Sequence, residues 1–162
     1  FIFGEDNDRL EKKVVELLKK LNMNISTAES CTGGMLASKL IDVPGISEVF
    51  YEGVVSYSNE AKINRLGVRK EILDKYGAVS EEVAKEMVMG LTTDVALSTT
   101  GIAGPDGGSE EKPVGLVYMG IRIKDKIYVE KRVFRGDRNK VRERTVSHTL
   151  FTLIKILNED VW

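Results

Sequence analysis

The chain has 162 residues, 42% of them hydrophobic and 30% charged, which predicts one soluble globular domain with a core of its own. Its 24 basic and 25 acidic residues nearly cancel, and no basic block stands out, so we expect a small-molecule ligand and neither a nucleic-acid nor a membrane partner. One Cys and one His exclude an internal disulfide and an all-Cys/His zinc site, and no apolar run approaches the ~20 residues that span a bilayer, so a cytoplasmic protein is expected.

The beginning of the chain has an extended pattern over residues 1–4 and apolar side chains at helical spacing over residues 10–21. The chain starts with Phe1 rather than Met, which leaves two interpretations, a domain cut from a longer protein and an expression artefact. Neither an internal repeat nor an interdomain linker follows, so we expect residues 1–162 to form a single domain.

The stretch at residues 26–34 reads STAESCTGG and joins a predicted strand near 24–28 to a predicted helix near 32–41. Such an elbow projects Ser30 from a rigid edge, and the free backbone N–H groups of the first helical turn can face an oxyanion or a phosphate. The stretch matches neither Gly-x-Ser-x-Gly, a phosphate loop nor a dinucleotide fingerprint. Helix capping with turn glycines is the alternative.

A second informative loop follows a β-rich run at residues 49–57. Ser58 or Asn59 can cap a short helix there, which holds Lys62 on a rigid element in its first or second turn. A third such loop, residues 101–108, contains four glycines and follows a predicted strand at 94–100. Between the two loops, the pattern predicts helices near residues 69–76 and 80–91, the latter opened by Ser80.

The last third of the chain predicts a hairpin from runs at residues 114–123 and 127–134. Because its turn lacks Gly, we expect a longer or irregular turn. A long helix from residue 136 to about 158 follows. Arg138 and Arg142 lie one turn apart near its start and can clamp a phosphate between them, the alternative being a solvated charged face.

The three loops meet at one edge if the strands that precede them are parallel and joined by right-handed crossovers. Ser30, Lys62 and Thr100-Gly101 then converge as ligand-binding residues do in open α/β sheets. The direction of the second strand is the open step, because part of this long run can also pair antiparallel.

Candidate catalytic chemistry depends on which base is available. His148 lies deep inside the last predicted helix, where a packed or solvated role is favoured over a catalytic one. Lys62, flanked by Ala61 and Ile63, is the other candidate, since a lysine whose pKa is lowered by burial can take the proton of a serine. A surface lysine is the alternative.

The nucleophile is open between Ser30 and Cys31, because a thiol at a helix N-terminus can ionise readily. Both side chains cannot easily point the same way at a strand-to-helix turn, so we expect one of them to be structural. Glu29 can orient Lys62 or a substrate hydroxyl, and an exposed edge carboxylate is the alternative.

Together these stretches resemble one family, the C-terminal domain of the CinA competence/damage-inducible proteins, whose stand-alone members are nicotinamide mononucleotide deamidases. The resemblance covers nearly the whole chain. It rests on six stretches in order: TAESCTGG at residues 27–34, VPG at 43–45, YSNEAK at 57–62, GAVS at 77–80, TGIAGP at 100–105 and FRGDR at 134–138. Residues 1–5 resemble the junction after the larger N-terminal domain of two-domain members, which favours a domain cut from a longer protein.

The resemblance implies an α/β fold, a three-layer α/β/α sandwich with a mixed central sheet, and hydrolysis of nicotinamide mononucleotide to nicotinate mononucleotide and ammonia without a metal or cofactor. The implied Ser/Lys mechanism falls on Ser30 and Lys62, with Tyr57 orienting Lys62 or stacking near the pyridinium ring. The residues expected to bind substrate are Glu29, Cys31, Thr32, Gly33, Gly34, Thr100, Gly101, Arg138 and Arg142. The alternative is a non-catalytic nucleotide-binding or interaction domain, and a homo-oligomer stays open.

Overall fold

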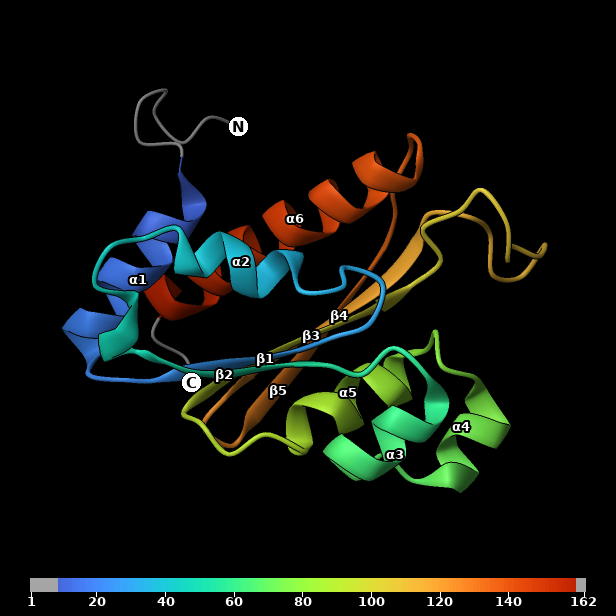
Figure 1. The fold of residues 1–162 in the computed structure, drawn as a ribbon, viewed down its shortest axis with the longest axis horizontal. Helices are drawn as coiled ribbons and strands as arrows, with labels where there is room; N and C mark the ends of the chain where they lie inside the picture. The colour runs from blue at the N-terminus through green and yellow to red at the C-terminus, as the bar shows by residue number, and fades with distance from the viewer. Residues whose placement is uncertain (1–8, 160–162) are drawn as a thin grey trace.

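The computed structural model describes residues 9–159, which form three layers with a five-stranded sheet in the middle (Figure 1). The sheet order is β2-β1-β3-β4-β5, with β1 parallel to both of its neighbours and β4 antiparallel to both of its own. The strands are β1 (Ile25–Glu29), β2 (Phe50–Val55), β3 (Val95–Gly101), β4 (Leu116–Ile123) and β5 (Lys126–Val133). The predicted sandwich with a mixed sheet is confirmed, and the second strand pairs in parallel.

Three helices cover each face of the sheet (Figure 1). One layer contains α1 (Leu10–Leu21), α2 (Met35–Ile41) and α6 (Arg138–Glu159). The other contains α3 (Asn59–Leu66), α4 (Lys70–Tyr76) and α5 (Glu81–Met89), and a short 3-10 turn (Ile46–Glu48) precedes β2. None of the described helices is long and apolar enough to cross a membrane.

Strand alternation divides the core in two. Ile25 and Leu97 face α1, α2 and α6, whereas Ala28 and Ala96 on the same strands face the layer of α3, α4 and α5. Both faces of β1 are therefore buried along its whole length, as expected for a parallel strand covered by helices on two sides.

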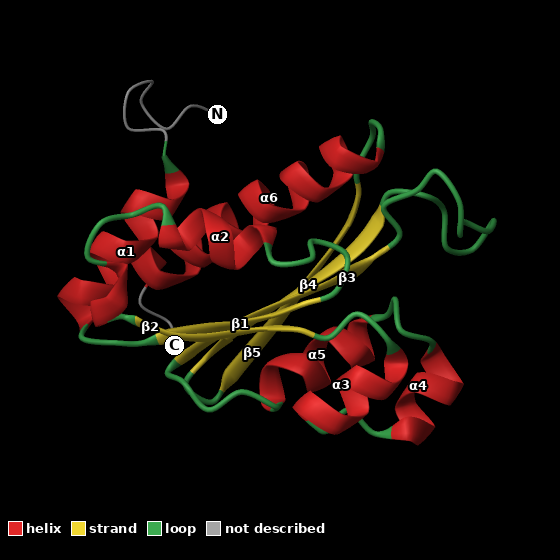
Figure 2. Cartoon of the chain, viewed as in Figure 1, coloured by secondary structure: helices red, strands yellow, loops and turns green. Residues whose placement is uncertain are grey.

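The three parallel strands end at the same edge of the sheet. The loops that follow β1, β2 and β3 gather there, at the right-hand end of the sheet in Figure 2, beside the start of α6. This is the convergence expected from the sequence, and it places the three loops around one site.

Two local expectations were wrong. Helix α2 begins at Met35 rather than near residue 32, because Gly33 and Gly34 have φ angles of +57° and +99°, which are not helical. Of the longer or irregular β4–β5 turn that was expected, the longer form is wrong, since Ile123 pairs with Lys126. Lys124 makes this possible by adopting φ +54°, a conformation usually left to Gly. The extended piece expected at residues 1–4 lies outside the described residues.

Candidate active site

Ser30 and Lys62 are brought together by two strand ends. Ser30 directly follows β1, and its backbone N–H still donates to the Thr99 carbonyl of β3 at 3.0 Å. Lys62 lies in α3, which follows β2 and is capped by the Ser58 hydroxyl accepting from the Ala61 N–H at 3.0 Å. The amine of Lys62 lies 3.1 Å from Ser30 Oγ. A rigid edge and a capped helix thus fix both groups.

The Lys62 amine has an environment that favours its neutral form. The side chain is 1% exposed, and its two other partners are the carbonyls of Ser56 at 2.9 Å and Tyr57 at 3.0 Å. No carboxylate pairs with it among the described residues. Burial therefore lowers the pKa of Lys62 from its ordinary value. A neutral amine donates its two N–H groups to the two carbonyls, which leaves the nitrogen lone pair for the Ser30 hydroxyl.

Cys31 points into the core instead. Its side chain is 7% exposed and packs with Val117 and Met119 of β4. Burial, the largest effect, raises the pKa of the Cys31 thiol to about 11. Cys31 is thus a neutral thiol near pH 7, and it is Ser30 that hydrogen-bonds Lys62.

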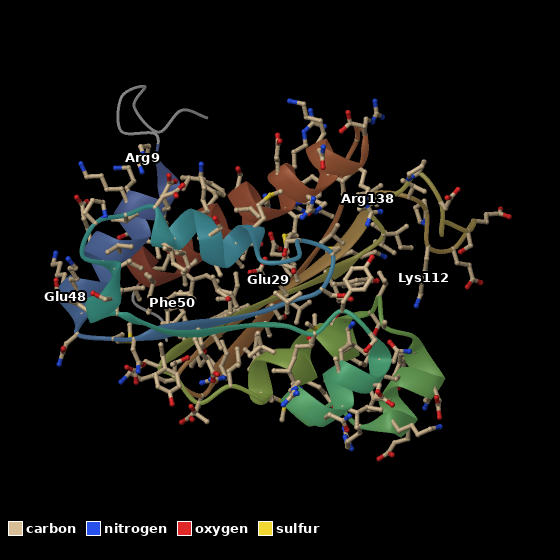
Figure 3. All side chains as sticks on the ribbon, in the orientation of Figure 1. Arg9, Glu29, Glu48, Phe50, Lys112 and Arg138 are labelled. Carbon is tan, nitrogen blue, oxygen red and sulfur yellow. The ribbon has the colours of Figure 1, made fainter. Side chains whose placement is uncertain are left out.

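Glu29 has a different position from either alternative considered for it. Its carboxylate is 1% exposed and lies under α2 (Figure 3). It accepts hydrogen bonds from the N–H groups of Gly34 (3.2 Å), Leu36 and Ala37 (both 2.9 Å), and from the Thr32 hydroxyl (2.5 Å). The expectation that these first-turn N–H groups are free for an anion was wrong, because an internal carboxylate already occupies them.

Two N–H groups in the turn keep no such partner. Within the part of the chain that the structure describes, the backbone N–H groups of Cys31 and Thr32 donate to no carbonyl or side-chain oxygen. The turn itself is fixed by a 2.7 Å hydrogen bond between the Thr32 and Thr99 hydroxyls. These two N–H groups adjoin Ser30 and are the donors that remain for a developing oxyanion.

Arg142 holds the elbow from the other side. From α6, its Nε donates to the Cys31 carbonyl and its Nη2 to the Thr32 carbonyl, both at 3.0 Å. Its Nη1 lies 3.4 Å from the Asn139 side chain. The guanidinium N–H groups are thereby committed to the turn, so Arg142 has few left with which to bind a phosphate together with Arg138.

Arg138 and Tyr57 form the mouth of the site. Arg138 is exposed at the start of α6 (Figure 3), and its Nη1 donates to the Gly104 carbonyl at 2.7 Å. Its Nη2 lies 3.5 Å from the Tyr57 hydroxyl. The Tyr57 side chain is 62% exposed, so residue 57 holds Lys62 through its carbonyl and presents its ring to the solvent.

Thr100 and Gly101 support the third loop from within. The Thr100 hydroxyl donates to the Ala78 carbonyl at 2.8 Å and is almost fully buried. A Cβ on Gly101 would lie 2.7 Å from Val117, so only Gly fits there. Both residues shape the end of β3 rather than presenting a free group.

Other residues complete this picture. His148 lies 3.1 Å from Glu130 and edge-on to Phe134, which confirms its packed role.

Sequence reasoning missed Ser56 and Thr99, whose signal is a polar residue where a buried strand ends. The described residues contain no group of three His, Cys, Asp or Glu side chains that could hold a metal ion.

Comparison with known proteins shows similarity in sequence and in fold. The profile of the CinA C-terminal domain matches residues 7–157. The chain belongs to the CinA C-terminal domain family. A CinA superfamily protein from Klebsiella pneumoniae has a similar structure, with a TM-score of 0.90 at 34% identity over 93% of this chain and 96% of that one. For the competence/damage inducible protein CihA from Agrobacterium tumefaciens, the TM-score is 0.89 at 38% identity, with 98% of both chains covered.

Curated relatives of this CinA domain are longer. A CinA-like protein from Fusobacterium nucleatum is 63% identical over 99% of this chain but only 40% of its own length. A putative competence-damage inducible protein from Clostridium beijerinckii is 55% identical over 96% of this chain and 39% of its own length. The chain thus spans about two fifths of the length of these relatives.

Proposed function

We propose that this CinA domain is an amidohydrolase that converts nicotinamide mononucleotide and water to nicotinate mononucleotide and ammonia. The observation that carries the proposal is the buried Lys62 amine, 3.1 Å from Ser30 Oγ, with two carbonyls as its other partners. This arrangement supports a serine nucleophile activated by a neutral lysine. The choice of substrate rests on the family resemblance.

In the first step, Ser30 Oγ attacks the carboxamide carbon while Lys62 takes the hydroxyl proton. The carbonyl oxygen becomes an oxyanion, which the N–H groups of Cys31 and Thr32 stabilise. Where it has been measured, one such donor contributes roughly 2.7–4 kcal/mol. The positive pyridinium ring assists by withdrawing electrons from the amide.

In the second step, protonated Lys62 gives its proton to the amide nitrogen, the C–N bond breaks and ammonia leaves. The product on the enzyme is an ester of Ser30. Lys62, neutral again, takes a proton from water, whose oxygen attacks the ester carbon. Returning this proton to Ser30 Oγ as the ester breaks restores the enzyme and releases the carboxylic acid, which gives its proton to the solvent and becomes the carboxylate.

Binding is assigned to the mouth of the site. Arg138 has exposed N–H groups beside the Gly104 carbonyl, and they suit the substrate's phosphate. The exposed ring of Tyr57 can stack near the pyridinium. Glu29 and Arg142 act by holding the elbow rather than by contacting substrate, because their polar atoms are committed to it.

Ammonia release tests the proposal. The wild-type chain, incubated with nicotinamide mononucleotide, is expected to form ammonia and nicotinate mononucleotide in equal amounts, while Ser30→Ala forms neither. Binding of the nucleotide without turnover would instead support the alternative, a non-catalytic nucleotide-binding domain.

A further inference from the structure

The Ser56 hydroxyl is buried without a partner next to the reacting groups. Ser56 is 0% exposed, and its Oγ has no hydrogen-bond partner among the described residues. The backbone of the same residue is fully used, since its N–H donates to the Glu29 carbonyl at 2.9 Å and its carbonyl accepts from Lys62 at 2.9 Å. A buried hydroxyl without a partner is costly, and therefore calls for an explanation.

Strand alternation places this hydroxyl on the side of Ser30 and Lys62. Ala28 and Val54, which pair across β1 and β2, both pack into the core on the α3 and α5 side. Ser30 and Ser56 come two residues after them, so their side chains point to the same side. Lys62 reaches the strand ends from α3, in that same layer.

The three hydrogen bonds of Lys62 are complete only before the reaction starts. At rest, the amine has the Ser56 carbonyl, the Tyr57 carbonyl and Ser30 Oγ as partners. Once Ser30 has given up its proton and bonded to the substrate, the ammonium has three N–H groups and two fixed acceptors. A third acceptor is then needed in a buried site, where an unpaired charged N–H is costly.

We infer that Ser56 is a positioning residue whose hydroxyl accepts the third N–H of protonated Lys62, and so holds the ammonium until its proton passes to the leaving nitrogen. Rotation about χ1 moves the hydroxyl among three staggered positions beside the carbonyl that Lys62 already contacts. The bond forms only with the charged amine, so it stabilises the transition state more than the resting enzyme. The inference rests on the proposed Ser30–Lys62 reaction.

Other charged groups on the elements around Lys62 do not supply this acceptor. Glu29 is bonded to the N–H groups of α2, and the thiol of Cys31, with its raised pKa of about 11, is neutral near pH 7. Arg142 is a cation committed to the turn, and the Tyr57 ring is exposed at the mouth. Among the buried hydroxyls of the described residues, the one on this side of the sheet that has no hydrogen-bond partner is that of Ser56.

The test compares Ser56→Ala with Ser56→Thr and with the control Thr27→Val. Thr27 Oγ1 is the other buried hydroxyl without a partner among the described residues, but it lies on the α2 side of the sheet. A Cβ added to Gly53 would lie 3.0 Å from this oxygen. Ser56→Ala is expected to lower kcat for nicotinamide mononucleotide about 10- to 100-fold, because this factor corresponds to the loss of one hydrogen bond to a charged group. KM should stay within about twofold. Ser56→Thr should restore most of kcat, and Thr27→Val should keep it.

Two further readouts separate this role from a structural one. Ser56→Ala should not lower the urea midpoint of unfolding, because it removes a hydroxyl without a partner. It should leave the acid limb of the kcat/KM profile in place, because in the free enzyme Ser30 Oγ accepts the third N–H of protonated Lys62. An unchanged kcat, in a wild type that releases ammonia, would overturn the inference and leave the proposed function standing.

If the wild type released no ammonia, the proposed function itself would fail. The contact of Ser56 with Lys62 would then be tested without substrate in Ser30→Ala, which lacks the third acceptor of the resting amine, by NMR titration of the 13Cε resonance of Lys62. A lower pKa of Lys62 in the double variant Ser30→Ala/Ser56→Ala than in Ser30→Ala alone supports the contact, and equal values overturn it.

Discussion

Lys62 Nζ and Ser30 Oγ lie 3.1 Å apart, although 32 positions separate the two residues in the chain. Each is held by a neighbouring parallel strand, Ser30 at the end of β1 and Lys62 on the helix after β2. Lys62 has the largest fully buried polar side chain in the described part of the chain, and its amine has no carboxylate partner there. Burying an amine without a carboxylate partner opposes folding, so its position calls for a functional reason.

The two possible nucleophiles are separated by Ser30→Ala and Cys31→Ala. Ser30→Ala removes the hydroxyl that Lys62 activates, so turnover should be abolished while the nucleotide still binds. Cys31→Ala should keep most of kcat and cost about 1 kcal/mol of stability, because it removes one small buried group. Ammonia assays and urea unfolding of both variants check this. Cys31 being essential and Ser30 dispensable would replace the serine mechanism by a thiol one.

The two arginines should affect different kinetic parameters. Arg138→Ala should raise KM by about one to two orders of magnitude, because a charged hydrogen bond to the phosphate is lost. It should change kcat little. Arg142→Ala should mainly lower kcat, because Arg142 holds the carbonyls of Cys31 and Thr32 beside Ser30. Steady-state kinetics with Arg132→Ala as an exposed control measures both. An unchanged KM for Arg138→Ala would mean that the loops bind the phosphate without Arg138.

Glu29 should be a stability residue. Glu29→Ala leaves the N–H groups of Gly34, Leu36 and Ala37 and the Thr32 hydroxyl without this acceptor. We expect a loss of about 2–4 kcal/mol in the free energy of unfolding, since hydrogen bonds to charged groups contribute ~1.5–3 kcal/mol each and do not add fully. The exposed Glu52→Ala should change it by less than ~0.5 kcal/mol. Equal urea midpoints for the two variants would contradict the capping role.

How much the sequence predicts depends on whether a property is local. Strand and helix periodicity, the Ser58 and Ser80 caps and the gathering of three loops at one edge all follow from short-range patterns. The role of Glu29 does not, because its burial arises only when α2 packs over the end of β1. A carboxylate at a strand end is usually exposed, so the pattern favoured the wrong environment.

Cys31 and Arg142 show the same limit. The direction of the Cys31 side chain is set by the space beside Val117 and Met119, on a strand far along the chain. The partners of Arg142 are carbonyls of the elbow, 110 and 111 positions away, and carbonyls carry no sequence signal. Contacts made by the backbone of a distant loop were therefore beyond prediction.

The lowered pKa of Lys62 should also make the free energy of unfolding depend on pH. Its pKa is lowered in the folded protein, so between that value and the free-lysine value of about 10.4 the unfolded chain binds a proton that the folded one does not. The free energy of unfolding therefore rises with pH in that window. Relative to Lys62→Met, which cannot titrate, the wild type should gain stability from pH 7 to pH 10. Urea unfolding curves that shift in parallel for both proteins would show that Lys62 has an ordinary pKa when folded.

Replacing Lys62 by Arg keeps the charge and removes the base. A guanidinium does not release its proton near neutrality, so Lys62→Arg should be nearly inactive, as should Lys62→Ala. Both should stay folded by circular dichroism. Substantial turnover by Lys62→Arg would mean that residue 62 acts only as a positive charge, and another group would have to be the base.

The pH dependence of kcat/KM for nicotinamide mononucleotide tests the central claim most directly, because it reports the titration of the base in the free enzyme. Burial lowers the pKa of Lys62, so the rate should rise with pH along an acid limb whose midpoint lies below the free-lysine value of about 10.4. Any residual turnover by Lys62→Ala should lack this limb. An acid limb that stays in place in Lys62→Ala would contradict the assignment of Lys62 as the base for Ser30.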